Sequence, residues 1–187
     1  MPVHADEVVA RPEWSIGDWW EIGRYRFTVS GRKDDTYEMI RTVKGKSADR
    51  AAAKPYKVSM DIDGWISERV EPGGSVSETL EDKKHEWVRF PLSVGSQWVF
   101  YVLGKSRMGT LQRYDYECRA TKWEELDVAE RQVRSLRIAC QSWTLTNPKK
   151  RSDHTVWYAP EAKRYIKLVS HYAGGPTLTC SAWSVRP

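Results

Sequence analysis

The sequence predicts an all-β protein: a single-domain antiparallel meander that forms a curved sheet, half-barrel or barrel, with at most one short helix. Three observations indicate this fold class. Apolar and polar residues alternate with a period of two through much of the chain, which is typical of strands with one buried face. Clusters of glycine, proline and asparagine separate these runs, as in hairpin turns. The 187 residues also include ten tryptophans and nine tyrosines, and aromatic side chains favour strands.

The strand-like runs follow one another from residue 18 to residue 185. They cover residues 18–30, 36–43, 56–62, 65–70, 97–103, 111–128, 133–146, 155–158, 163–172 and 177–185. The spacing of the turn signals predicts about eight to eleven antiparallel strands. Helix signals are scarce, and residues 47–54 could form about two turns with Ser47 as the N-cap. Trp98 starts a run in which the residues that point to either face of a strand are apolar. We therefore expect a strand covered on both faces, with Trp98 in the core.

The composition fits one globular domain, with 40% hydrophobic and 29% charged residues. We assign residues 13–187 to a single β domain and residues 1–12 to a signal-peptide remnant or mobile tail. Val3 and Ala5 occupy the −3 and −1 positions of an export cleavage site, although such spacing of small residues also arises by chance. We therefore expect an exported protein of the periplasm or cell envelope of a bacterium. The longest apolar run, residues 98–103, is far shorter than the roughly 20 residues of a transmembrane helix.

The net charge of +5 is spread along the chain among acidic residues. The one basic cluster, Lys149-Lys150-Arg151 after Pro148, is interpreted as a solvated turn. No basic stripe with interleaved aromatic residues is evident, so a specific nucleic-acid partner is not expected. The positive charge would favour anionic membrane surfaces or polysaccharides only weakly.

Three cysteines, Cys118, Cys140 and Cys180, lie on alternating segments beside apolar neighbours. All three can be buried thiols, and in an oxidising compartment at most one disulfide forms. Cys118 and Cys140 are the leading pair because they lie on the two arms of one predicted hairpin. If Val128 paired with Val133, the two cysteines would be offset by three positions, and a bulge in the 111–128 arm could restore their alignment.

Two phrases stand out, Phe90-Pro91-Leu92-Ser93-Val94-Gly95-Ser96-Gln97-Trp98 and Trp157-Tyr158-Ala159-Pro160-Glu161. Their order resembles exported bacterial β-rich proteins of unassigned function that carry PLxVGxxW and WYAPE phrases, and which are similar to lipoprotein-carrier half-barrels. The chain departs from that pattern between the phrases, where Ala129-Glu130-Arg131 replaces Pro-Ala-Gly and Val133 replaces an aromatic residue. The resemblance implies export and a curved antiparallel sheet, and it implies no reaction.

The aromatic residues admit a structural and a functional interpretation. In the first, they fill the core and the ends of a barrel, while Gly95 permits a sharp corner and Pro160 ends a strand. In the second, they line a pocket on the concave face. The pocket lining predicted from strand starts and turn-rich ends is Trp20, Tyr101, Trp157 and Tyr165. Such side chains combine an apolar body with a polar tip, which suits an amphiphile.

Catalytic groups are sparse. Asp153 and His154 are neighbours in sequence, but adjacent strand residues point to opposite faces, so the carboxylate would not orient the imidazole. No spacing of histidines, cysteines or carboxylates indicates a metal site, and no motif indicates a cofactor or a nucleophile. We therefore expect a protein that is not an enzyme, with no metal and no cofactor.

The function predicted from the sequence is binding of a hydrophobic or amphiphilic ligand, or of a protein partner, on an aromatic-rich concave sheet. The alternative is a structural or interaction module of a cell-envelope complex without a small-molecule ligand, whose sheet edge pairs with a partner. The partners expected are a lipid, another hydrophobic ligand or an envelope protein.

Overall fold

The computed structural model describes residues 7–33, 36–43, 56–60, 66–70, 76–79, 86–105, 111–128, 130–172 and 175–187. These ranges contain twelve strands and one short 3₁₀ helix. The elements are β1 (Trp19–Ile22), β2 (Tyr25–Lys33), β3 (Thr36–Val43), β4 (Tyr56–Met60), β5 (Ile66–Val70), β6 (Val76–Thr79), β7 (Gln97–Lys105), β8 (Leu111–Val128), β9 (Arg131–Thr144), β10 (Asn147–Ala159), η1 (Pro160–Ala162), β11 (Arg164–Ser170) and β12 (Thr177–Ser184). The helix expected at residues 47–54 lies outside the described residues.

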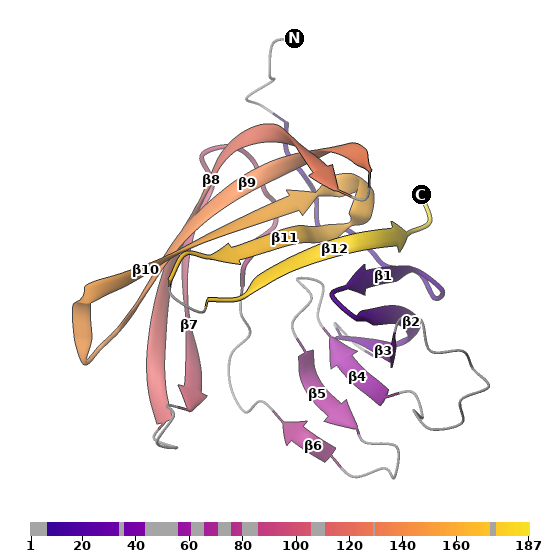
Figure 1. Cartoon of the computed structure of the whole chain (residues 1–187), viewed down its shortest axis with the longest axis horizontal. Coiled ribbons are helices and arrows are strands. Elements are labelled where there is room, and N and C mark those ends of the chain that lie inside the picture. Colours follow the sequence, from indigo (N-terminus) through magenta and orange to yellow (C-terminus); the bar gives the residue numbers. More distant parts are fainter. Residues whose placement is uncertain are drawn as a thin grey trace.

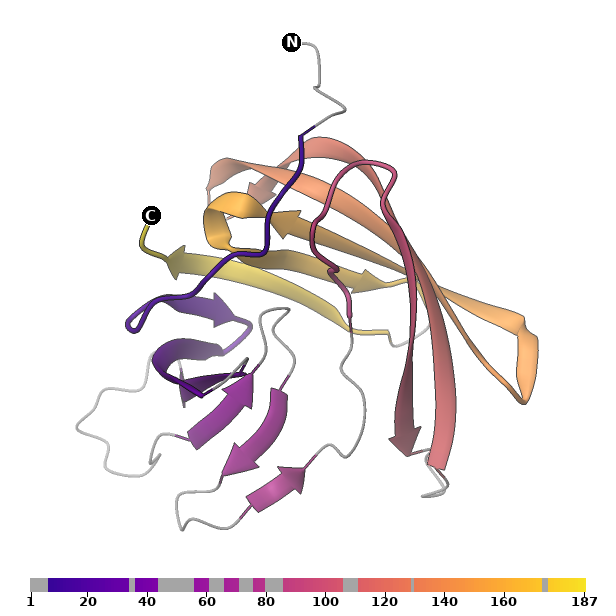
Figure 2. The ribbon, with the colours of Figure 1, turned by 180° about the vertical axis from the view of Figure 1, so that it is seen from behind.

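All twelve strands belong to one antiparallel sheet, in the order β6-β5-β4-β3-β2-β1-β12-β11-β10-β9-β8-β7. Neighbours in the sheet are neighbours in sequence except at one place, where β1 pairs with β12. In the described residues β6 and β7 are the two edges, so the sheet is open, and it bends until both edges lie on the same side of β11 and β12 (Figures 1 and 2). The all-β class and the curved antiparallel sheet predicted from the sequence are confirmed.

The number of strands exceeds the predicted eight to eleven for two local reasons. Residues 18–30 form two strands, because Gly23 takes a positive φ of 57° and reverses the chain between β1 and β2. The left-handed region costs glycine little. Strand β6 was not expected, because its sequence VSET has no alternating apolar pattern.

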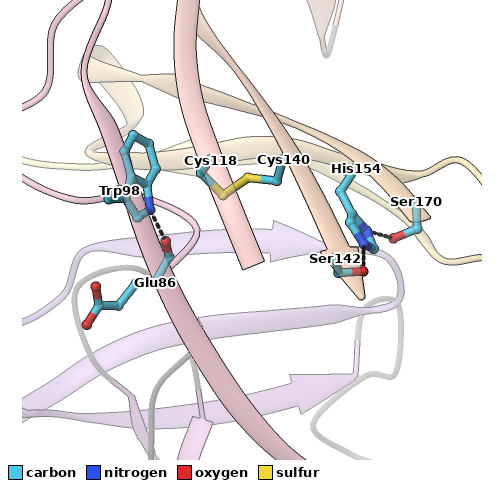
Figure 3. Close-up of a disulfide and its surroundings, with 7 residues drawn as sticks. All are labelled: Glu86, Trp98, Cys118, Cys140, Ser142, His154 and Ser170. Atoms are coloured by element: carbon cyan, nitrogen blue, oxygen red, sulfur yellow. Dashed lines mark hydrogen bonds between the residues drawn. A yellow bond between two sulfur atoms is a disulfide. The ribbon is translucent and has the colours of Figure 1, made fainter. Parts of the chain in front are cut away.

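A first hydrophobic cluster covers one face of β7–β11 and is completed by the segment from Trp87 to Leu92. Trp98 belongs to it with 4% exposure, and its indole N–H donates to the carbonyl of Glu86 at 2.7 Å (Figure 3). The prediction that Trp98 is core is confirmed. The expected cover on both faces is wrong, since Val99 is 66% exposed. In this apolar run, Trp98, Phe100 and Val102 lie on the buried face of β7, and Val99 lies on the outer face.

A second cluster lies on the opposite face of the sheet at β10 and β11. Val156 and Tyr158 pack in the first cluster, whereas Trp157 between them packs against the second. The centre of the second cluster holds Trp14 and Trp20, with ring centroids 4.7 Å apart. The Trp20 indole donates to the carbonyl of Ala162 at 2.7 Å. This bond ties β1 to the turn that joins β10 to β11.

The two turns expected from proline and glycine lie where the sequence indicates them. Strand β10 ends at Ala159 and η1 begins at Pro160, because proline cannot continue the hydrogen-bonded ladder. At the start of β7, Gly95 has a φ of +92°, and its N–H donates to the carbonyl of Ala120 at 2.9 Å. That bond fastens the corner before β7 to the middle of β8.

Strands β8 and β9 form the longest hairpin, and it aligns two of the cysteines. Cys118 pairs with Cys140, and the two form a disulfide with a Cα–Cα distance of 4.1 Å (Figure 3). The register considered from the sequence, with Val128 opposite Val133, is wrong: Val128 pairs with Arg131 across a tighter turn. With Val128 opposite Val133, Cys118 and Cys140 would have been three residues out of alignment. The tighter turn corrects two of these residues, and a bulge between Ala120 and Lys122 corrects the third.

The segment before β1 runs along the body of the sheet. Val9 and Leu92 form an isolated antiparallel bridge, with N···O distances of 2.7 and 2.9 Å. Glu7 pairs with Arg134 on β9 at 2.5 Å. Part of the stretch predicted as a tail or signal remnant, residues 7–12, therefore contacts the domain, while residues 1–6 lie outside the described residues.

Candidate functional site

A cavity of about 440 Å³ lies beside the β9–β10 hairpin. This volume falls in the usual range of small-molecule sites, roughly 300–1,000 Å³. Strands β8, β9 and β10 supply most of its walls, and one further side chain follows β11. The aromatic part of the lining is Tyr114, Tyr116, Trp143 and Tyr172.

Hydroxyl and amide groups form most of the remaining lining: Gln112, Ser142, Thr144, Thr146, Asn147 and Ser152. Several of them bond to one another. The hydroxyl of Tyr114 donates to Gln112 Oε1 at 3.2 Å, and Gln112 Nε2 donates to Thr146 Oγ1 at 3.2 Å. The ionisable lining residues are Lys150 and His154, and none of the lining residues carries a carboxylate. The cavity thus offers aromatic surface and neutral or cationic polar groups, which suits an amphiphile with a neutral or anionic polar part.

His154 forms the buried end of this polar lining. Its Nε2 lies 2.8 Å from Ser142 Oγ, and its Nδ1 lies 2.9 Å from Ser170 Oγ, so one serine from each neighbouring strand holds the ring (Figure 3). Burial lowers the pKa of His154 below its usual value and His171 acts in the same direction, while Asp153 opposes them. A neutral imidazole has one donor and one acceptor nitrogen, and two hydroxyls can satisfy both.

The aromatic wall beside His154 is also held in its neutral form. The ring of Tyr116 lies 5.7 Å from the imidazole, and burial raises the pKa of Tyr116 to about 12. The phenol therefore remains protonated at neutral pH. Near pH 7 this end of the cavity consists of uncharged hydrogen-bonding groups.

Acid should destabilise the wild-type protein through His154. The native state binds fewer protons at this group than the unfolded state, because the pKa of His154 is lower when folded. Its contribution is present above the unfolded pKa of about 6.5 and is lost as the pH falls through the folded value. Lowering the pH from about 7.5 to about 5 should therefore reduce the Tm of the wild type more than that of His154→Gln. Parallel Tm curves from differential scanning calorimetry would contradict the burial of a neutral ring.

Two of the four aromatics named from the sequence are core residues. Trp20 is fully buried in the second cluster. Tyr165 is 9% exposed and belongs to the first cluster, with the guanidinium of Arg164 5.1 Å from its ring centroid. These two residues lie in different clusters, and neither lines the cavity.

The other two lie outside the cavity as well. Tyr101 alternates with the buried Phe100 and Val102 on β7, and its ring is stacked under Arg113 at 4.1 Å. The indole N–H of Trp157 donates to Glu124 Oε1 at 2.5 Å, and Lys167 lies 5.2 Å from its ring centroid. The four aromatics therefore do not form a common lining.

The sequence analysis did not identify His154, Ser142 and Tyr172 as neighbours. It expected Asp153 not to orient His154, and the structure agrees, since Asp153 is exposed and accepts from Gln141 Nε2 at 2.9 Å. The missing information was the register of β9 against β10, where an irregularity between Asn147 and Ser152 decides which residues face each other. No sequence signal fixes that irregularity.

Two further features of the described residues bear on the site. No group of three or more histidines, cysteines or carboxylates is arranged there to hold a metal ion. In the same ranges no helix has the length and apolar character needed to span a bilayer.

Comparison with known proteins gives a fold and no family. No protein-family model matches the chain, and no curated protein sequence matches it. Among solved structures, the chain is similar to the hypothetical lipoprotein YmcC from Escherichia coli K12, with a TM-score of 0.51 and 12% sequence identity. The match covers 91% of this chain and 84% of that chain. The likeness shows that the two proteins share a fold.

Proposed function

We propose that this protein is a non-catalytic component of the bacterial cell envelope that binds an amphiphilic ligand in the cavity beside the β9–β10 hairpin. The observation that carries the proposal is the composition of the lining: four aromatic rings face hydroxyls, amides, His154 and Lys150, with no carboxylate. The rings would hold an apolar portion of the ligand, and the hydroxyls and Lys150 would bind a neutral or anionic polar part.

Two observations support a place in the envelope. The Cys118–Cys140 disulfide is a bond that persists in oxidising compartments such as the bacterial periplasm. The solved structure with the similar fold is described as a hypothetical lipoprotein. Both observations favour an exported protein.

The absence of catalysis is likewise part of the proposal. Ser142 and His154 are hydrogen-bonded, as a nucleophile and its base would be. However, acyl transfer also needs free N–H groups around the developing oxyanion. Ser142 lies within the β9–β10 ladder, opposite Ser152, where backbone groups are used in strand pairing. His154 and Ser142 then serve as a neutral part of the cavity lining, and Ser170 holds the imidazole from β11.

Ligand binding can be tested with a dansyl-labelled fatty acid as the probe. The wild type should bind it saturably at micromolar concentration, and Tyr172→Ala should weaken binding by about two- to tenfold, because the variant removes one ring of the wall. Tyr101→Ala is the matched control, since its ring lies outside the cavity and its loss should leave the Kd unchanged. Thr146→Trp, which places an indole at an exposed lining position, should abolish binding.

Two outcomes would overturn the proposal. If Tyr172→Ala and Tyr101→Ala weakened binding of the dansyl-labelled fatty acid equally, the cavity would not be its binding site. The lack of any saturable signal with the wild type would favour the alternative, an interaction module that binds no small molecule.

A further inference from the structure

The tip of the β9–β10 hairpin, residues 143–151, combines exposed apolar surface with an uncompensated positive charge. Leu145 is 63% exposed, and Trp143 beside it is half-buried. Lys149, Lys150 and Arg151 follow within six residues and are all exposed. The hairpin extends beyond the rest of the sheet in both views of the molecule (Figures 1 and 2). These groups are therefore presented together, away from the body.

Several cations elsewhere in the described sheet have carboxylate partners, and the three cations of the tip do not. Arg26 pairs with Glu21 at 2.6 Å and Lys122 with Glu124 at 2.7 Å. Between Gln141 and Asp153 the sequence contains no acidic residue. Within the described part of the chain, no carboxylate lies within ion-pair distance of the three tip cations. The tip thus carries three positive charges that no carboxylate of the described residues neutralises, and Lys149 and Arg151 lie outside the cavity lining.

The contact between Arg151 and Trp143 holds a cation beside an aromatic ring. This pair suits the surface of a lipid bilayer, where anionic headgroups lie above an apolar interior. The Arg151 guanidinium lies 4.3 Å from the centroid of the Trp143 ring and 3.3 Å from Gln141 Oε1. Tryptophan favours the boundary between lipid headgroups and acyl chains, and lysine and arginine favour anionic headgroups. An exposed leucine at the end of a hairpin gains from burial among acyl chains.

We infer that this tip docks on the surface of an anionic lipid bilayer, with Leu145 inserted below the headgroups, Trp143 at their level, and Lys149 and Arg151 against the phosphates. An acidic protein or a nucleic acid would satisfy the charges, but a nucleic acid offers no apolar phase for Leu145. The inference does not depend on the ligand proposed for the cavity. It adds that one edge of the cavity lies at the membrane surface, because the lining residues Thr146 and Asn147 belong to the tip.

Cosedimentation with lipid vesicles tests the docking. The wild type should bind vesicles of phosphatidylcholine that contain about 30 mol% phosphatidylglycerol, because anionic headgroups attract surface cations. It should bind pure phosphatidylcholine weakly. Lys149→Gln with Arg151→Gln should reduce the partition coefficient about thirtyfold, roughly fivefold for each cation. Raising the salt from about 0.1 M to about 1 M should have a similar effect, because screening shortens from about 10 Å to about 3 Å.

Matched variants distinguish an effect of the tip itself from an effect of the protein's total charge or surface hydrophobicity. Lys33→Gln with Arg131→Gln removes the same charge from exposed sites, and Arg131 also stacks on a tryptophan, 3.7 Å from the ring centroid of Trp183. This control should bind as the wild type does. Leu145→Asp should weaken binding at least about tenfold. Ile16→Asp, at a site that is 61% exposed, should not.

Vesicle binding and binding of the dansyl-labelled fatty acid can be tested separately. Thr146→Trp blocks the proposed ligand site but adds no negative charge, so vesicle binding should persist in this variant even though dansyl-probe binding is lost. Failure of the wild type to cosediment would overturn the docking, as would equal losses in the tip variants and their controls. A wild type that binds vesicles but no probe would leave the docking standing and remove the proposed ligand.

Discussion

Trp98→Ala should lower the free energy of unfolding by about 3–5 kcal/mol, the usual cost of emptying a large aromatic site in a core. The indole is 4% exposed in the first cluster. Its N–H also donates to the carbonyl of Glu86, so the variant would remove one of the bonds that hold residues 86–96 against β7. We expect the loss to include both the cavity and this unsatisfied carbonyl.

Chemical denaturation followed by circular dichroism measures the change. Trp143→Ala is the matched control, because Trp143 belongs to neither cluster and its removal should cost no more than about 1 kcal/mol. Trp98→Phe should recover part of the loss, since a phenyl ring fills part of the site without an N–H. A Trp98→Ala variant with the stability of the wild type would show that residues 86–96 do not cover this face in solution.

Replacing both Cys118 and Cys140 by alanine should lower the free energy of unfolding by about 3–5 kcal/mol. The two cysteines are 22 positions apart in sequence, and closing a loop of this size in the unfolded chain corresponds to about 3.4 kcal/mol in the chain-entropy model. Both sites are also buried, at 1% and 2% exposure, so lost packing adds to the effect. Cys180→Ala is the control, because Cys180 is a free cysteine.

Alkylation and mass spectrometry check the pairing. The unfolded wild type should take up one alkyl group without reductant, at Cys180, and three after reduction. In the folded protein Cys180 should react slowly, because it is 1% exposed and burial raises the pKa of its thiol. Three alkylated thiols without reductant would rule out the disulfide.

The fold class could be predicted because alternation and turn residues are local properties of the chain. Strand β10 ends where Pro160 requires it, and β7 begins after the positive φ of Gly95. Which face of a strand is buried is not local. In β7 both Trp98 and Val99 are apolar, and only the covering segment from residue 86 to residue 96 decides that one is core and the other exposed.

The candidate site was less predictable because it depends on register across three strands. The sequence analysis chose aromatics near strand ends, but Trp20 and Tyr165 were needed for the two cores. His154 lies between Ser142 and Ser170 only because β10 is irregular between Asn147 and Ser152. A one-residue slip would place the imidazole on the opposite face of the sheet.

The pairing of β1 with β12 has a consequence for how the chain folds. Trp19 and Ser184 are partners although almost the whole sequence separates them, and such distant pairings slow folding because loop closure comes before the contacts that compensate for it. Strands β7–β12 form a continuous set of hairpins and can assemble by themselves as the chain emerges, whereas β1 must wait for the last strand. Until then the edge of β1 that pairs with β12 has no partner, and a chain released early would expose an unpaired strand edge that invites aggregation.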